Sequence, residues 1–516
     1  LTTESVNVSD VADSLPEIVS ASYARRLDAS LLTTGRSKPV SLLAVETDRF
    51  ADVAWFRDDL SRKPLHEITS MLSEDDLGSG DGIVLPPETT HLAMWVRLGV
   101  SDKRTIVKAK IEDSKGLIFD MVLGETNQKD WIRIEGALVP IPTRFGRTRV
   151  TPDVQPPFKL HSLVFAFASQ SVQPTVLYLD QLFAVTPDQE YLVAEFGTDD
   201  GWRTIEDYSR PGLSGFEQSK SVVREGRHTG MYSSSPSGLA IRGIRKGKQQ
   251  NPIPALVSHS FIELSDAELG DTVNVRLSNV AAPIELKVAS EFFPTLFPQK
   301  EPFLVLSLES MNRFVSLHRT TNSSGPDELW MKLVDPSTPW DSIQQPIEES
   351  GINLRGVYSA HEMISDKFKQ TLVASGWEGL FVLMFVSVGA SAITGLMLFA
   401  YMDTRDRQME FALLRTLGLS RFQLRAVVWF TPLVIMFVGA ALGLGLGIAL
   451  TQALIPLLEV AEEGVRVTPP MVIHLNWMTV AAPYLTIAVV AFIVAPWLSW
   501  LAHKLDVQGV LRMGSG

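Results

Sequence analysis

The stretch Gly379–Met402 (GLFVLMFVSVGASAITGLMLFAYM) decides the fold class, because none of its residues carries a charge. Two more uncharged runs follow it, Ala426–Leu458 and Leu475–Ala502. A helix needs about 20 apolar residues to cross the hydrocarbon core of a bilayer, so each run is long enough. The sequence therefore predicts a membrane protein with an α-helical bundle of three visible spans, at 379–402, 426–458 and 475–502.

Charges between the runs predict the orientation of the spans. Residues 403–425 include five Arg and three acidic residues, whereas residues 459–466 include three Glu and one Arg. Because loops rich in Lys and Arg stay in the cytoplasm, we expect 403–425 and the tail 503–516 inside, and the loop 459–474 outside. Residues 1–375 are then extracytoplasmic.

That orientation raises a question about how the N-terminal part crosses the membrane. Residues 1–378 contain no apolar run long enough to span a bilayer and no pattern typical of a signal peptide. We therefore expect an upstream membrane span to precede Leu1.

Composition excludes several classes of site. The 516 residues include 46 Lys and Arg and 58 Asp and Glu, a net charge of −12. Residues 379–516 contribute eight basic and seven acidic residues, so residues 1–378 carry 38 minus 51, or −13. A nucleic-acid partner, which needs clustered basic residues, is not expected. The absence of Cys rules out disulfides, thiolate metal sites and a Cys nucleophile.

The N-terminal part divides at a Gly/Ser/Asp-rich break near residues 77–82. Residues 1–78 combine alternation at 40–45 with a helical pattern at 65–72, which predicts an extracytoplasmic α/β segment. Residues 83–190 contain six runs of period-two alternation, typical of an antiparallel sandwich similar to the jelly rolls of carbohydrate-binding modules. The runs are His91–Leu98, Thr105–Asp113, Leu117–Leu123, Trp131–Leu138, Leu160–Phe167 and Val176–Val185. Ligand binding and a spacer role both remain open for this sandwich.

The chain up to the first span continues with short strands and turns. Residues 191–359 are expected to form a separate extracytoplasmic α+β domain. Charges interspersed with apolar residues over 360–378 predict a stalk helix that continues into the membrane.

Motifs for chemistry are missing from the sequence. The nearest approach to a phosphate-binding loop, Gly243–Lys248, has the wrong spacing. No HExxH or GxSxG pattern is present. We therefore expect no enzyme activity and no catalytic, cofactor-binding or metal site in this chain. The spans contain no ionisable Asp, Glu, Lys or Arg, so energy for any transport must come from elsewhere.

The second span carries a stripe of small residues. Gly439, Gly443 and Gly447 recur every four residues, which lets another helix approach closely. Packing within one bundle and a dimer seam are equally consistent with it.

The loop at 403–425 is the most specific segment. Phe411, Leu414 and Leu417, spaced by three, are expected on one side of a short helix. Gly418 suits the left-handed position that ends a helix, and Ser420 with Gln423 forms a capping box for the next one. The sequence thus predicts a short amphipathic helix joined tightly to the second span.

This loop resembles a known family. The run RDRQMEFALLRTLGLSRFQLRAVV at 405–428 is similar to the cytoplasmic loop of the FtsX-like permeases of ABC transporters, the MacB and LolC/LolE relatives. The segments SEFFPTLFP at 290–298, LGDTV at 269–273 and DELWMKL at 327–333 also resemble parts of large bacterial members.

The resemblance implies a partner and a coupling site. ATP would be hydrolysed by a separate cytoplasmic ATP-binding subunit that docks on a coupling helix at about Arg405–Leu417. Other implied partners are a second permease subunit or upstream permease half, and membrane lipid, in a bacterial inner membrane. The implied coupling residues are Arg405, Arg407, Glu410, Phe411, Leu414, Arg415 and Gly418.

Three functions remain open. The first is a permease subunit that extrudes or extracts a lipid, lipoprotein, peptide or drug. The second is a mechanotransmission permease that passes ATP-driven motion to an extracytoplasmic partner such as a cell-wall hydrolase. The third is a membrane-anchored carbohydrate-binding protein, which exposed aromatic rings on one sandwich face would favour.

Overall fold

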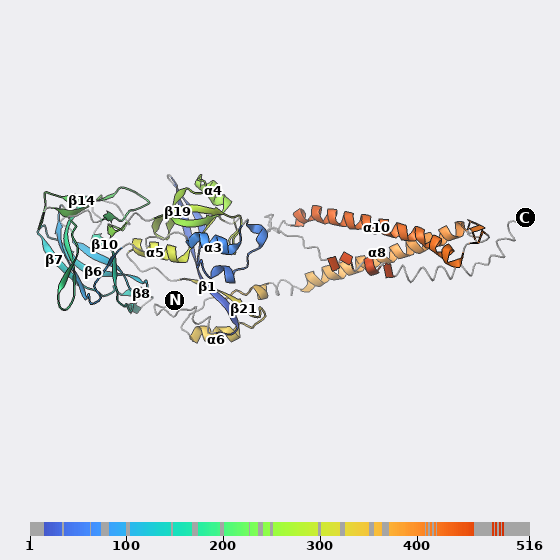
Figure 1. Ribbon diagram of the computed structural model, residues 1–516, viewed down its shortest axis with the longest axis horizontal. Coiled ribbons are helices and arrows are strands. Elements are labelled where there is room, and N and C mark those ends of the chain that lie inside the picture. The colour runs from blue at the N-terminus through green and yellow to red at the C-terminus, as the bar shows by residue number, and fades with distance from the viewer. Residues whose placement is uncertain are drawn as a thin grey trace, which may run out of the picture. The chain divides into compact units, whose positions relative to one another are not determined.

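The computed structural model divides into two compact units, residues 1–357 and 358–516, drawn in Figure 1. The described residues are 15–33, 36–61, 63–73, 82–99, 104–145, 148–167, 174–196, 201–226, 228–235, 241–247, 251–297, 301–319, 326–349, 356–363, 371–407, 409–410, 413–414, 417–418, 420–458, 477–478, 480–481, 484–486 and 488–489.

One sheet of the first unit closes on itself. Its strand order is β18-β19-β17-β20-β2-β1-β21, and β18 also pairs with β1. The strands are β1 (Ile18–Thr33), β2 (Arg36–Val45), β17 (Ile253–Val257), β18 (Thr272–Leu277), β19 (Val280–Ala289), β20 (Phe303–Ser307) and β21 (Glu328–Leu333). Residues Ala29–Leu31 of β1 pair with Val275–Leu277 of β18. We call this set of strands the closed sheet.

Helices cover the closed sheet on both faces. The helices of this part are α2 (Phe50–Val53), η1 (Asp58–Leu60), α3 (Leu65–Ser73), α4 (His259–Ser265), α5 (Leu308–His318) and α6 (Asp341–Glu349). One apolar cluster joins the sheet to α4 and α5, and another joins it to α2 and α3. All five residues of β17 and of β20 are buried, as expected for strands with both faces covered.

The remaining strands of the unit form two antiparallel sheets. One has the order β13-β16-β10-β5-β6 with β3 beside β10, and the other has β14-β15-β11-β4-β7 with β12 beside β11. Their bounds are β3 (Ile83–Val84), β4 (His91–Leu98), β5 (Thr105–Glu112), β6 (Ile118–Thr126), β7 (Ile132–Ala137), β10 (Lys159–Phe167), β11 (Thr175–Val185), β12 (Glu190–Ala194), β13 (Trp202–Thr204), β14 (Ser214–Ser219), β15 (Thr229–Ser234) and β16 (Gly243–Lys246). A separate pair, β8 (Thr143–Phe145) and β9 (Thr148–Val150), lies between β7 and β10 in the sequence.

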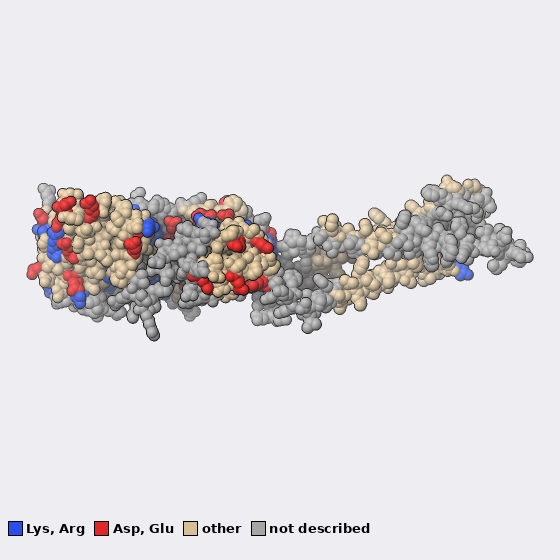
Figure 2. Space-filling view, turned by 90° about the horizontal axis from the view of Figure 1, so that it is seen from below, with Lys and Arg blue, Asp and Glu red and all other residues tan. Residues whose placement is uncertain are grey.

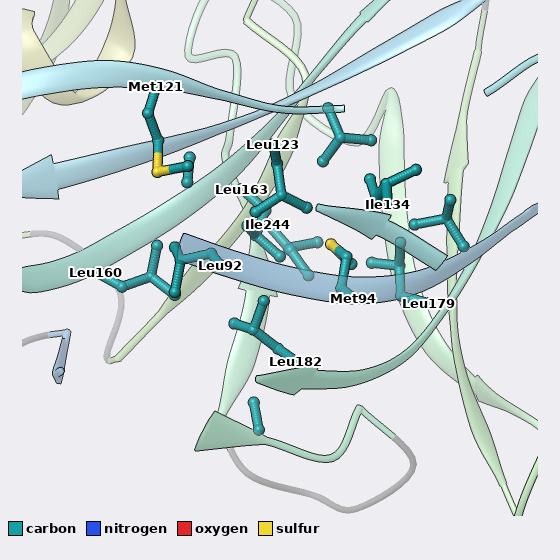
Figure 3. Close-up of a cluster of buried hydrophobic side chains, with 14 of the residues drawn as sticks. Leu92, Met94, Met121, Leu123, Ile134, Leu160, Leu163, Leu179, Leu182 and Ile244 are labelled. Carbon is teal, nitrogen blue, oxygen red and sulfur yellow. The ribbon is translucent and has the colours of Figure 1, made fainter. Parts of the chain in front are cut away.

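The two sheets share one hydrophobic core, so together they form a β-sandwich. Met94 and Leu179 from one sheet and Leu123 and Leu163 from the other belong to the same buried cluster, and Figure 3 shows these side chains between the strands. Alternate residues of β4 and β11 point into this core because successive side chains of a strand face opposite sides.

Two domain boundaries differ from those expected from the sequence. The sandwich does not end at residue 190, because β12 to β16 pair with its strands. The segment 1–78 is not a separate unit either, since β1 and β2 pair with strands from residues 253–333. Both differences arise from pairing between segments distant in the sequence.

The second unit contains two long helices. α8 (Thr371–Asp406) and α10 (Arg421–Leu458) contact each other. Each contains a 22-residue stretch long and apolar enough to cross a membrane, Val382–Asp403 and Leu433–Leu454. Figure 2 shows few charged residues along this part. The third predicted span, 475–502, lies largely outside the described residues. α8 already includes residues 371–378 of the predicted stalk.

Candidate functional site

The connection between α8 and α10, residues 407–420, is the first candidate site, which we call the α8–α10 loop. The backbone amide of Leu417 donates to the carbonyl of Leu413 at 3.1 Å, so a helical turn precedes Gly418. Gly418 has a φ of 94°, the left-handed conformation expected where a helix ends.

A reciprocal cap then starts α10. The Ser420 amide donates to Gln423 Oε1 at 3.0 Å, and the Gln423 amide donates to Ser420 Oγ at 3.3 Å. These bonds satisfy two amides that lack partners at a helix start. The predicted sequence of helical turn, left-handed Gly and capped helix is therefore present among the described residues of the loop.

The polar residues predicted for coupling lie at different places. Arg405 belongs to the last turn of α8. Arg407 Nε is 3.0 Å from Asp403 Oδ1, one turn earlier. Glu410 is exposed. Phe411 and Arg415 lie outside the residues whose side chains are described.

The exposed apolar side chains of this loop differ in part from those singled out in the sequence, with Leu417 common to both sets. Met409, Leu413 and Leu417 are 69%, 65% and 72% exposed, whereas Leu414 is half-buried. Residues spaced by four lie on one side of a helix, and so do residues spaced by three. The expected helix face was defined by the spacing of three alone, which missed Met409 and Leu413.

The glycine stripe of α10 has one neighbour among the described residues. A Cβ added to Gly443 would lie 3.9 Å from the hydroxyl of Tyr484, whereas one added to Gly439 or Gly447 would meet no described atom within 4 Å. Among the described residues, the close approach to the stripe is therefore at Gly443, its middle glycine.

A second candidate site is a group of buried charges where the sandwich meets α5. Lys110 Nζ lies 2.6 Å from Asp120 Oδ1, and the two side chains are 3% and 9% exposed. Lys110 also donates to the backbone carbonyl of Arg319 at the C-terminal end of α5, at 2.5 Å. Burial lowers the pKa of Lys110, and Asp120 opposes that shift. A cation beside the last carbonyls of a helix is favourable.

Glu112 is the centre of a second contact to α5. His161 Nε2 donates to Glu112 Oε2 at 2.5 Å, and the guanidinium of Arg313 lies 3.4 Å from Glu112 Oε1. The hydrogen bond from His161 lowers the pKa of Glu112 despite its burial. We call Lys110, Glu112, Asp120, His161 and Arg313, with the Arg319 carbonyl, the charged joint.

Aromatic packing accompanies the charged joint. His318 stacks on Phe314 with ring centres 4.1 Å apart, and Tyr208 lies beside both rings. His318 Nδ1 donates to the Phe314 carbonyl at 2.9 Å. Burial lowers the pKa of His318 to about 4, so the ring is neutral at neutral pH.

The outer face of the sheet containing β4 and β11 bears aromatic rings, as a sugar-binding face would. However, the guanidinium of Arg224 lies 3.8 Å from the Trp95 ring centre, and Arg133 lies 5.7 Å from that of Phe183. Each of these two rings therefore has a cation over one face, where a sugar would stack. Among the described residues, no group of three His, Asp or Glu is placed to hold a metal ion.

Two long apolar helices joined by a capped turn fit an integral membrane protein, and a large β-rich part precedes them. Residues 380–507 match the family model of the FtsX-like permease C-terminal domain. This C-terminal part of the chain is thus similar to the FtsX-like permeases, a family of the ABC-transporter type. Permeases of this family are generally non-enzymatic and typically work with a cytoplasmic ATP-binding subunit. A search of curated proteins returned no match.

Proposed function

We propose that this chain is the permease subunit of an ABC-type transporter in a bacterial inner membrane, with residues 1–375 outside. ATP hydrolysis in a separate subunit drives extrusion or extraction of a lipid, lipoprotein, peptide or drug. The observation that carries the proposal is the α8–α10 loop, whose left-handed Gly418 and capping box lie within the matched domain. A short, fixed loop between two spans passes a push from a docked subunit directly into α10.

Met409, Leu413 and Leu417 supply the apolar contacts for that docking, together with the predicted Phe411 and Leu414. Exposed apolar side chains in a charged loop are typical of a binding surface. The surrounding Arg405, Arg407, Glu410 and Arg415 supply a polar rim.

The test replaces two of these side chains. Leu413→Asp together with Leu417→Asp should weaken capture of the ATP-binding subunit by about tenfold or more, as loss of central apolar contacts does. Co-purification of the two tagged subunits from membranes measures the effect. The matched control is Val334→Asp, which changes a similarly exposed apolar residue of the N-terminal unit. Equal capture by both variants would refute docking at this loop.

A specific observation favours the mechanotransmission alternative as a second candidate. α8 runs without interruption from Thr371, before the span, to Asp406 beyond it. A helix of 36 residues is about 54 Å long, well beyond the ~30 Å hydrocarbon core. Such a rod would transmit movement of the inner loop to the segment before the membrane. ATP-dependent activation of a co-expressed wall hydrolase, without substrate release, would distinguish this role from transport.

A further inference from the structure

The sandwich and the closed sheet have separate hydrophobic cores. The buried cluster of the sandwich contains residues from Leu85 to Ile244 only, whereas the clusters of the closed sheet draw their buried residues from before Leu85 and after Ile244. Among the described residues, Tyr208, between β13 and β14, packs on a cluster of the closed sheet. The two bodies are thus joined with little shared apolar surface.

Charged groups contribute to the contact as well. Lys110 reaches the carbonyl at the end of α5, and Arg313 of α5 reaches Glu112. Interfaces between domains that are polar and small permit relative motion, in contrast to large apolar ones.

Each charge on the sandwich side keeps a partner if the contact is broken. Lys110 pairs with Asp120 on the adjacent strand β6, and Glu112 accepts from His161 on the adjacent strand β10. Among the described contacts, opening would remove those of the sandwich charges to Arg319 and Arg313, and the packing of Tyr208 on Phe314 and His318. It would therefore avoid the large free-energy cost of an unpaired buried charge.

The closed contact also leaves polar atoms unsatisfied. Arg313 Nε and Ser162 Oγ are buried without a hydrogen-bond partner among the described residues. Such atoms destabilise the closed arrangement relative to one in which water reaches them. A permanent interface would be expected to pair them.

We propose that the charged joint is a reversible latch, through which the sandwich swings away from α5 while both bodies stay folded. The proposal concerns residues 1–357 alone and does not depend on which subunit hydrolyses ATP. Its failure would leave the transport proposal intact.

The absence of Cys in the chain makes the latch directly measurable. Lys115→Cys in the sandwich and Glu309→Cys on α5 are both at exposed positions, so spin labels there report the distance across the joint. The full chain in nanodiscs is measured by double electron–electron resonance. A second pair within the sandwich, Lys115→Cys with Glu217→Cys, reports whether that body remains folded.

Arg313→Gln should raise the ratio of the population with longer distances to that with shorter distances about tenfold. This factor corresponds to the loss of one hydrogen bond to a charged group. The matched control is Arg319→Gln, because Lys110 binds the backbone carbonyl of Arg319, which this variant retains. Identical narrow distributions in the parent and both variants would overturn the latch. An equal shift in the control variant, or broadening of the pair within the sandwich, would overturn it as well.

Discussion

The charged joint and the α8–α10 loop handle charge in opposite ways. In the joint, Lys110 and Asp120 are buried and bonded to each other. In the loop, Arg405, Arg407 and Glu410 are exposed. Burial makes the Lys110–Asp120 pair important to the stability of the sandwich, because a lone buried charge is costly. Exposure leaves the charges of the loop nearly irrelevant to stability, since surface ion pairs contribute little. The Lys110–Asp120 pair therefore stabilises the sandwich, and the loop is available for a partner.

Lys110→Met should produce the largest effect on stability. It leaves Asp120 buried without its cation, so we expect the free energy of unfolding of the N-terminal unit to fall by about 3–5 kcal/mol. Lys110→Met combined with Asp120→Leu should recover most of that loss, because two apolar groups replace the pair. Denaturant unfolding followed by Trp fluorescence measures both.

Lys115→Met is the control for this comparison, because Lys115 is exposed in a turn. It should change the unfolding free energy by less than about 0.5 kcal/mol. If Lys110→Met were as mild as the control, the joint would not be a site of obligatory charge pairing.

Acid should weaken the same region through His318. Its pKa is lowered from 6.5 to about 4 by burial, so the unfolded state binds more protons between those values. The contribution of neutral His318 to stability is therefore fully present above pH 6.5, and this contribution is lost as the pH falls towards 4. Between pH 7 and pH 4.5 this residue should account for a loss of about 2–3 kcal/mol.

His318→Gln tests that assignment by removing the titrating group. The difference in unfolding free energy between pH 7 and pH 4.5 should shrink by about 2–3 kcal/mol. His259→Gln, at an exposed position, should leave the difference unchanged. A pH dependence unaltered by His318→Gln would show that other groups cause the acid sensitivity.

Local pattern predicted many of the elements. The alternating run His91–Leu98 coincides with β4, and Thr105–Asp113 coincides with β5 to within one residue. Gly418 and the Ser420–Gln423 cap were also predicted, and both are observed. These features depend on neighbours within a few residues, so their signal lies in the local sequence.

Long-range pairing was not predictable in the same way. Strand β16 joins the sandwich by pairing Leu163 with Ile244, far apart in the sequence, and no local pattern specifies that partner. The charged joint has the same origin, since Glu112 and Arg313 are 201 residues apart in the sequence. A lone Lys110 on a half-buried strand resembles any solvated lysine in the sequence.

The smallest predicted effect concerns the turn of the α8–α10 loop. Gly418→Ala places a side chain at a φ of 94°, and an added Cβ meets no described atom within 4 Å. The cost is therefore conformational, about 1 kcal/mol, without a steric clash. Amide exchange in a peptide covering residues 409–425 should accelerate about fivefold by mass spectrometry.

Gly439→Ala separates the backbone conformation from the substitution itself. Gly439 lies within α10 and also has open space around an added Cβ. Alanine in a helix interior is favoured over glycine by about 1 kcal/mol, so exchange near residue 439 should slow or stay the same. If amide exchange accelerates in Gly418→Ala but slows in Gly439→Ala, the left-handed conformation of the turn, and not the loss of glycine as such, stabilises the loop between α8 and α10. Equal acceleration at both sites would mean that the turn has no special conformational role, and the direct transmission proposed for it would lose its physical basis.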